Sequence, residues 1–377
     1  MTQWQPMVKK LDGPPAAPVV GERERLRRGR ALFQEGRYDE ALGEFEMLRA
    51  EQPASAQAWL GIGLVRRRQQ QMDEALACFS EACHLDPLLP KAYVLEGQAL
   101  LEQGQLDRAM LAFQSALNLD PKSVKAMTGF GQVLRRQQRY EEALTQLRAA
   151  LRYDPRKVQP RLLIAEIYRE RGETAAALNE LRLVLEIAPG HVRAAIVLAR
   201  LLLATGEPDA ASEVLSAALA RVAEGDAGAA AQLGRAALEL QLYAVAEAAL
   251  RTALQHEPER MSIRLRLVEA LLASGQLAEA EHQAAELPQN SAIAPLVHKL
   301  LGDIHYKRQQ FQLAVEQYRA TVLHLPDHEQ MLSDLESELA AGGDWEELAE
   351  ELQPSVAGRV AAEARRLRQD RRHREPR

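Results

Sequence analysis

The sequence predicts an all-α fold, an α-solenoid of about nine helical hairpins closed by a degenerate C-terminal repeat. Three features share a period of 34 residues: a recurring alanine, a small residue twelve positions before it, and a proline twelve positions after it in seven of nine modules. A fixed period of this length is typical of stacked units that each contact only their neighbours. The alanines are Ala41, Ala75, Ala109, Ala143, Ala177, Ala211, Ala246, Ala280 and Ala314, with one step of 35 before Ala246.

Each module is predicted to contain two short helices. In the third module, apolar residues recur at helical spacing over residues 91–101, and Gly104 ends the run as a C-terminal cap would. Residues 107–119 are again helical in period, and Asp120-Pro121 stops the second helix. The same arrangement repeats along the chain, so each module is predicted to be a helical hairpin.

The small residue of the first helix predicts that the two helices of a module cross closely. Glycine inside a helix costs about 1 kcal/mol relative to alanine, and this cost is explained if no larger side chain fits at the crossing. The recurring alanine is then the other half of the contact. The small residues are Gly29, Gly63, Gly97, Gly131, Ala165, Ala199, Gly234 and Gly302, with Val268 as the exception.

These features together resemble the tetratricopeptide repeat over residues 22 to about 353. The resemblance implies a right-handed α-solenoid whose first helices line a concave wall, and a function in binding other proteins. Glu336 stands at the small position of a tenth, degenerate module, as in a capping repeat. The second module carries the resemblance most clearly, through Trp59, Ile62, Gly63, Ala75, Phe79, Ala82 and Pro87.

The chain is predicted to have four segments. The extra residue of the 35-residue step falls in residues 224–228, where we predict a softer joint between two arrays. The segments are a disordered lead-in at 1–21, an N-terminal array of six repeats at 22–225, a C-terminal array of three repeats and a cap at 226–353, and an Arg-rich amphipathic tail at 354–377.

A stripe of basic residues on the first helices of modules one to four is the candidate binding site. If these helices line the concave wall, module positions 2, 5, 9, 12 and 13 face the groove, where Glu102 is the single acid. The sequence therefore predicts a basic groove with an aliphatic floor. Its residues are Arg23, Leu26, Arg30, Leu60, Leu64, Arg67, Arg68, Lys91, Val94, Lys125, Arg135 and Arg136.

Composition and motifs narrow the function. No phosphate-binding loop, nucleophile elbow or metal-ligand spacing occurs, so we expect no enzyme activity, no cofactor and no metal site. The longest apolar stretch, 194–204, is broken by Arg200 and falls short of the roughly 20 residues that span a bilayer. With two cysteines and no export signal, the cytoplasm is the expected location.

The sequence therefore predicts a non-catalytic protein-interaction scaffold that captures an acidic, apolar-anchored peptide or helix in the basic groove. Two alternatives stay open. The first is a nucleic-acid or ribonucleoprotein factor that uses the groove and the Arg-rich tail, although a net charge of −6 and few aromatics disfavour nucleic acid as a partner. The second is an accessory subunit of an envelope or polysaccharide assembly complex. Formation of a homo-oligomer also stays open.

Overall fold

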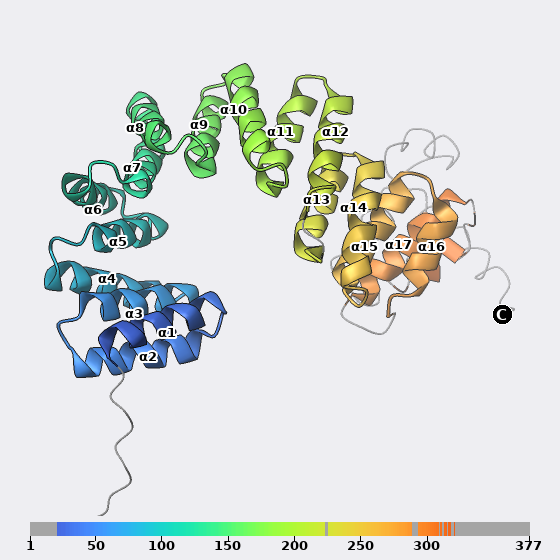
Figure 1. The fold of residues 1–377 in the computed structure, drawn as a ribbon. Helices are drawn as coiled ribbons and strands as arrows, with labels where there is room; N and C mark the ends of the chain where they lie inside the picture. The colour runs from blue at the N-terminus through green and yellow to red at the C-terminus, as the bar shows by residue number, and fades with distance from the viewer. Residues whose placement is uncertain are drawn as a thin grey trace, which may run out of the picture. The chain divides into compact units, whose positions relative to one another are not determined.

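The computed structural model describes residues 21–222, 225–288 and 293–308, with the single positions 310, 313, 314, 316, 317 and 320. These residues form seventeen α-helices and no strand, which confirms the predicted fold class (Figure 1). Nearly all of the predicted lead-in, the degenerate repeat at 329–352 and the tail at 354–377 lie outside the described residues.

The chain divides into two compact units, of which unit 1 ends at Glu173 and unit 2 begins at Thr174. This division falls between the two helices of the fifth repeat. The joint that the sequence predicts between residues 225 and 226 stays a prediction.

Unit 1 contains four complete hairpins and the first helix of the fifth repeat. Odd-numbered labels are the first helices of repeats, and even-numbered labels are the second helices. The helices are α1 (Glu22–Gln34), α2 (Tyr38–Glu51), α3 (Ala56–Arg68), α4 (Met72–Leu85), α5 (Pro90–Glu102), α6 (Leu106–Leu119), α7 (Val124–Arg136), α8 (Tyr140–Tyr153) and α9 (Val158–Glu170).

Unit 2 continues the same alternation within the residues that the structure describes. Its helices are α10 (Thr174–Ile187), α11 (Val192–Ala204), α12 (Pro208–Leu219), α13 (Ala227–Glu239), α14 (Tyr243–His256), α15 (Met261–Ala273), α16 (Leu277–Ala285) and α17 (Ala294–Lys307).

The helix crossings confirm that the small residues serve packing. All nine recurring alanines are fully buried. In unit 1 the ring of Phe45 from α2 lies against Gly29 of α1 and Gly61 of α3. A Cβ atom added at Gly29 would lie 2.6 Å from Cε1 of this ring, and one added at Gly61 would lie 2.5 Å from Cδ1. Each glycine therefore leaves the space that the ring fills, within one repeat and across to the next.

The turn between the two helices of a repeat uses one backbone position in the left-handed region. Gly104 ends α5 in this way, with a φ of 76°, and the amide of Gln105 donates to the carbonyl of Leu100 at 2.9 Å. Glycine occupies this position in most repeats, because only glycine adopts positive φ without cost. Glutamine occupies it at Gln70, Gln138 and Gln241.

A repeated side-chain hydrogen bond joins successive repeats of unit 1. Gln103, just after α5, donates to Asp73 in the first turn of α4 at 2.7 Å. The bond recurs one repeat earlier and one repeat later at 3.1 Å, and an ion pair of 2.5 Å takes its place in the fifth repeat. The equivalent pairs are Gln69–Asp39, Gln137–Asp107 and Arg171–Glu141.

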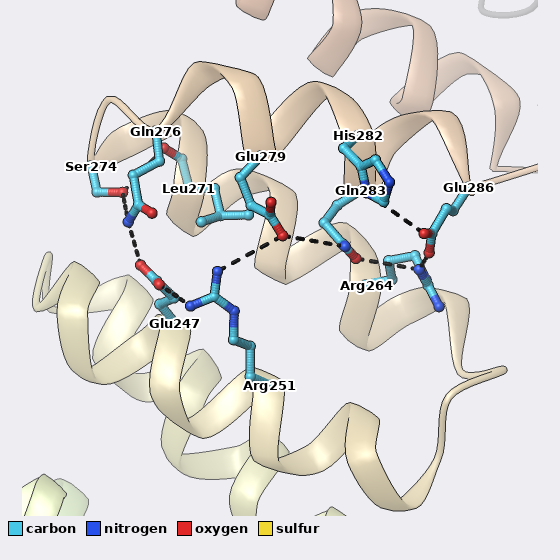
Figure 2. A network of polar contacts seen from close by, with 10 residues as sticks. All are labelled: Glu247, Arg251, Arg264, Leu271, Ser274, Gln276, Glu279, His282, Gln283 and Glu286. Atoms are coloured by element: carbon cyan, nitrogen blue, oxygen red, sulfur yellow. Dashed lines mark hydrogen bonds and ion pairs between the residues drawn. The ribbon is translucent and has the colours of Figure 1, made fainter.

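In unit 2 a different set of polar contacts joins successive repeats, in a network on α14, α15 and α16 (Figure 2). Gln276 at the start of α16 donates to Glu247 of α14 at 2.5 Å, and Glu247 also pairs with Arg251. Arg251 lies 3.8 Å from Glu279 of α16. These contacts link two second helices through polar side chains, of which Glu247 is only 15% exposed.

Contacts between first helices define the inner side of unit 1. Helix α1 contacts α3, α5 contacts α7, and α7 contacts α9, whereas no second helix of unit 1 contacts its successor as extensively. In a curved stack, neighbours on the inner side approach one another most closely. The first helices of unit 1 therefore lie on the inner side of its curve, as the sequence analysis expects.

Candidate functional site

A hollow of about 210 Å³ lies on the inner side of unit 1, between α1, α3 and α5. We call it the Lys91 hollow. Four predicted groove residues line it together: Arg30, Leu60, Leu64 and Lys91. Leu60 is buried and Leu64 half-buried, so they form a floor, while the two basic residues are exposed at the rim. Its other lining residues are Phe33, Gln34, Phe45, Gln57 and Gly61.

A second hollow of about 390 Å³ adjoins the first, because Arg30 and Gln34 line both. It brings together the predicted groove residues Arg23 and Leu26, both on α1. Arg23 is exposed and Leu26 half-buried. The N-terminal end of the predicted groove is therefore a continuous surface with an apolar floor and a basic rim.

Two positive charges, Arg30 and Lys91, lie at this rim, and the charge of Lys125 on α7 also acts on Lys91. Partial burial, and after it the charges of Arg30 and Lys125, lower the pKa of Lys91 below its ordinary value of 10.5. Arg30 donates to the neutral amide oxygen of Gln57 at 3.0 Å. None of the three cations has an ion-pair partner among the described residues. The rim therefore holds uncompensated positive charge that a carboxylate could neutralise.

The remaining basic residues of the predicted groove mainly join neighbouring first helices. Arg67 of α3 donates to Gln98 of α5 at 3.1 Å, and Arg136 of α7 donates to the carbonyl of Leu101 at 2.8 Å. The guanidinium of Arg68 lies 5.9 Å from the centre of the Phe33 ring, in a cation–π contact. These side chains lie on the predicted face, but they also stabilise the stack.

Two predicted groove residues have a different environment from the one expected. Arg135 pairs with Glu166 at 3.1 Å and with Glu170 at 2.5 Å, both on α9. The first helix of the next repeat therefore compensates a charge that the sequence analysis assigned to a basic surface. Val94 is only 6% exposed and belongs to the core around Phe113, because its position on α5 turns toward the neighbouring helices.

The structure adds residues that the sequence analysis did not select. Phe33, Gln34 and Gln57 line the Lys91 hollow and occupy module positions 12, 13 and 2. The positional rule already included them, and only its restriction to charged and aliphatic residues left them out. Phe45 reaches the hollow from α2 because Gly61 leaves room beside it.

The two cysteines and the core histidines are occupied in packing. Burial, reinforced by the nearby Glu96 carboxylate, raises the pKa of the Cys83 thiol, which therefore stays protonated and unreactive. His305 is 8% exposed, and its Nδ1 lies 3.0 Å from the side-chain oxygen of Gln310. No three His, Cys, Asp or Glu side chains of the described residues are placed to hold a metal ion.

Stacked hairpins with a basic, apolar-floored inner surface define a class of protein: a helical repeat array that presents an interaction surface. Family models agree with this class. One model described as "Tetratricopeptide repeat" matches residues 26–90 and 128–192. A second model with the same description matches residues 168–233 and 237–304. A model described as "Anaphase-promoting complex, cyclosome, subunit 3" matches residues 68–150. The chain belongs to the tetratricopeptide repeat family.

Solved structures similar to this chain are also repeat proteins. A tetratricopeptide repeat protein from Parabacteroides merdae is 17% identical, with a TM-score of 0.47, and the match covers 66% of this chain and 98% of that one. Pseudomonas aeruginosa pilF is 18% identical, with a TM-score of 0.46 and coverage of 51% and 87%. A thermophilic repeat protein from Thermus thermophilus, TTC0263, is 24% identical, with a TM-score of 0.43 and coverage of 48% and 100%.

No curated protein matches the chain. Among the described helices, none has both the length and the apolar character needed to cross a membrane.

Proposed function

We propose that this protein is a non-catalytic interaction scaffold whose unit 1 binds an acidic segment of a partner protein through one large apolar anchor residue. The observation that carries the proposal is the Lys91 hollow, where an apolar floor lies beneath cations that have no acidic partner among the described residues. Membership of the tetratricopeptide repeat family supports protein binding in general. The acidic, anchored partner is the specific part of the proposal.

The size of the hollow favours a single anchor. An engineered protein cavity of about 150 Å³ holds one benzene molecule, so a hollow of about 210 Å³ has room for one aromatic or branched aliphatic side chain. Leu60 and Leu64 would contact this anchor, and Phe33 and Phe45 would border it. Burial of its apolar surface would supply most of the binding free energy, at about 25 cal/mol per Å².

The cations would select the flanking residues of the partner. The charges of Arg30 and Lys125 both act on Lys91, so carboxylates on either side of the anchor would reduce this repulsion. Because these side chains lie at a solvent-exposed rim, they would raise the association rate and the salt dependence more than the final affinity. An acidic segment is therefore preferred over a neutral one with the same anchor.

The proposal is tested by selecting random short peptides displayed on phage against the immobilised full chain. We expect enrichment of a Leu, Phe or Trp flanked by Asp and Glu. The selected peptides are then synthesised with a fluorophore, and their affinities are measured by fluorescence polarisation. Arg30→Glu combined with Lys91→Glu should weaken binding by about tenfold or more, which corresponds to about 1.4 kcal/mol.

A matched control has the same charge change outside the groove. Arg152 is exposed on α8, a second helix, and Arg156 is exposed in the turn after it, so Arg152→Glu combined with Arg156→Glu should leave affinity unchanged. In contrast, replacing the apolar anchor of the peptide by alanine should abolish binding to the wild-type chain. Selection of peptides without acidic bias, or equal binding by the Arg30 and Lys91 double variant, would reject the proposed site.

A further inference from the structure

Unit 2 has a larger hollow on its own first helices, distinct from the groove of unit 1. It has a volume of about 640 Å³ and is lined by α11, α13 and α15. Its floor is wide because α13 presents Gly228 and Ala231 there, where longer side chains would fill the space. Arg200, Arg235, Arg260 and Arg266 surround it, and Glu239 is the one acid in the lining. We call it the unit 2 hollow.

The arginines of this hollow are held by weak, exchangeable pairs. Arg200 and Arg235 share Glu239, at 2.9 and 3.0 Å, so one carboxylate serves two guanidinium groups. Arg260 pairs with Glu257 across the turn between α14 and α15 at 2.7 Å, and Arg266 pairs with Glu269 one turn away on α15 at 2.8 Å. All four arginine side chains are at least 50% exposed. Exposed pairs contribute little stability, so an incoming carboxylate can replace them.

The chain itself contains a segment with the complementary charge. Residues 327–352 include ten Asp and Glu residues and no Lys or Arg. Large apolar residues stand among these acids at helical spacing, so each group of three falls on one face of a predicted helix. The two groups are Leu332, Leu335 and Leu339, and Trp345, Leu348 and Leu352.

We propose that the acidic segment 327–352 docks in the unit 2 hollow of the same chain. Its carboxylates would pair with Arg200, Arg235, Arg260 and Arg266, and an apolar face would cover the floor formed by Ile196, Ala231 and Ile263. This surface and its ligand are independent of the peptide site proposed in unit 1.

The position of the segment in the chain favours docking within one molecule. Helix α17 contacts α15, which lines the hollow. The segment begins at Asp327, only a short stretch of chain after Ala320, the last described residue, and this stretch reaches about 25 Å when extended. If this stretch spans the distance to the hollow, the tether gives an effective concentration in the millimolar range, against which an equal segment in solution would have to compete.

Charge also excludes the neighbouring segment as the occupant. Residues 355–377 carry eight Arg against three acids, a balance of 8 − 3 = +5. Four arginines around the hollow would repel such a segment, because like charges placed opposite each other in an interface oppose binding. The acidic segment, in contrast, would gain partners for carboxylates that a simple terminal cap would leave exposed to water.

The test places a photo-cross-linking amino acid, p-benzoyl-phenylalanine, at Gln232, an exposed residue beside the floor of the hollow, in the full chain. After irradiation, peptide mapping by mass spectrometry should find cross-links to residues 327–352, in a product with the mass of a monomer. The variant Arg235→Glu with Arg266→Glu should reduce this cross-link by about tenfold. A second variant that also carries Glu346→Arg, Glu347→Arg and Glu350→Arg should restore it.

Matched controls separate loss of docking from loss of fold. Arg182 and Arg221 are exposed outside the hollow, and reversing both should leave the cross-link unchanged. Circular dichroism should show equal helix content for all variants. Cross-linking to other segments only, a cross-linked dimer, or a signal that is indifferent to the arginines would overturn the proposal, whereas peptide binding by unit 1 would be unaffected.

Discussion

The contact between Gly61 and Phe45 gives the sharpest prediction about stability. A Cβ atom at Gly61 would lie 2.5 Å from Cγ and Cδ1 of Phe45 and 2.6 Å from Cε1, whereas carbon atoms in contact are about 3.5–4.0 Å apart. Phe45 is 3% exposed, so its ring has no open space to enter. Overpacking of this kind costs about 1–3 kcal/mol, and three close ring atoms place Gly61→Ala near the upper end.

The higher helix propensity of alanine opposes this loss of stability, and a second glycine serves as the control for it. Alanine is about 1 kcal/mol better than glycine inside a helix, so Gly61→Ala should destabilise the protein by about 2 kcal/mol in all. Gly43 lies in the interior of α2 with nothing within 4 Å of an added Cβ. Gly43→Ala should therefore stabilise the protein by about 1 kcal/mol, although the amino-acid change is identical.

The assay is urea unfolding of the full chain, followed by far-ultraviolet circular dichroism. A double variant, Gly61→Ala with Phe45→Leu, should recover part of the loss, because a smaller side chain frees space for the new methyl group and neighbouring substitutions couple. If Gly61→Ala proves as stable as Gly43→Ala, the close crossing does not determine the choice of glycine and the packing argument fails.

Two further predictions concern a turn and the pH dependence of binding. Gln138 has a φ of 61°, where a side chain costs about 1–2 kcal/mol. Gln138→Gly should therefore raise the unfolding midpoint in urea. Gly104→Ala, at the equivalent turn, should lower this midpoint. Binding of acidic peptides to unit 1 should weaken as pH rises through the pKa of Lys91, which lies below 10.5 because burial and neighbouring cations favour the neutral amine. A polarisation titration should show this decline at lower pH for the wild type than for Lys91→Arg, which keeps its charge; identical profiles would contradict the role of Lys91.

The fold could be predicted from the sequence because its determinants lie within one period. Gly104 and Asp120-Pro121 mark the ends of helices by local backbone chemistry, and the predicted helices over 91–101 and 107–119 correspond to α5 and α6. The alanine period needs only nearest-neighbour packing to become a stack. These helix-end and packing residues recur in every module, so the fold can be predicted even where one module lacks one of them.

The site was harder to predict because it depends on how neighbouring repeats meet. Arg30 and Lys91 follow the same positional rule, and both line one hollow. The pairing of Arg135 could not be predicted from its own module, because the acids that compensate it, Glu166 and Glu170, belong to the next repeat. Val94 shows the same limit, since it shares module position 5 and burial with Leu60, but only Leu60 lines the Lys91 hollow.

The Phe45 ring packs between a glycine of its own repeat and a glycine of the next. This packing limits how the repeats can be rearranged in evolution. Phe113 packs in the same way between Gly97 and Gly129. Phe79 contacts Gly63 in its own repeat, but the next repeat has Leu95 at the position where Phe45 and Phe113 contact a glycine. The ring of one module therefore requires a particular residue in the next module. A duplication or deletion that moves two modules together keeps each ring beside the residue that it now contacts. The loss of the second module alone would bring Leu95 beside Phe45, in place of the glycine that now makes room for the ring.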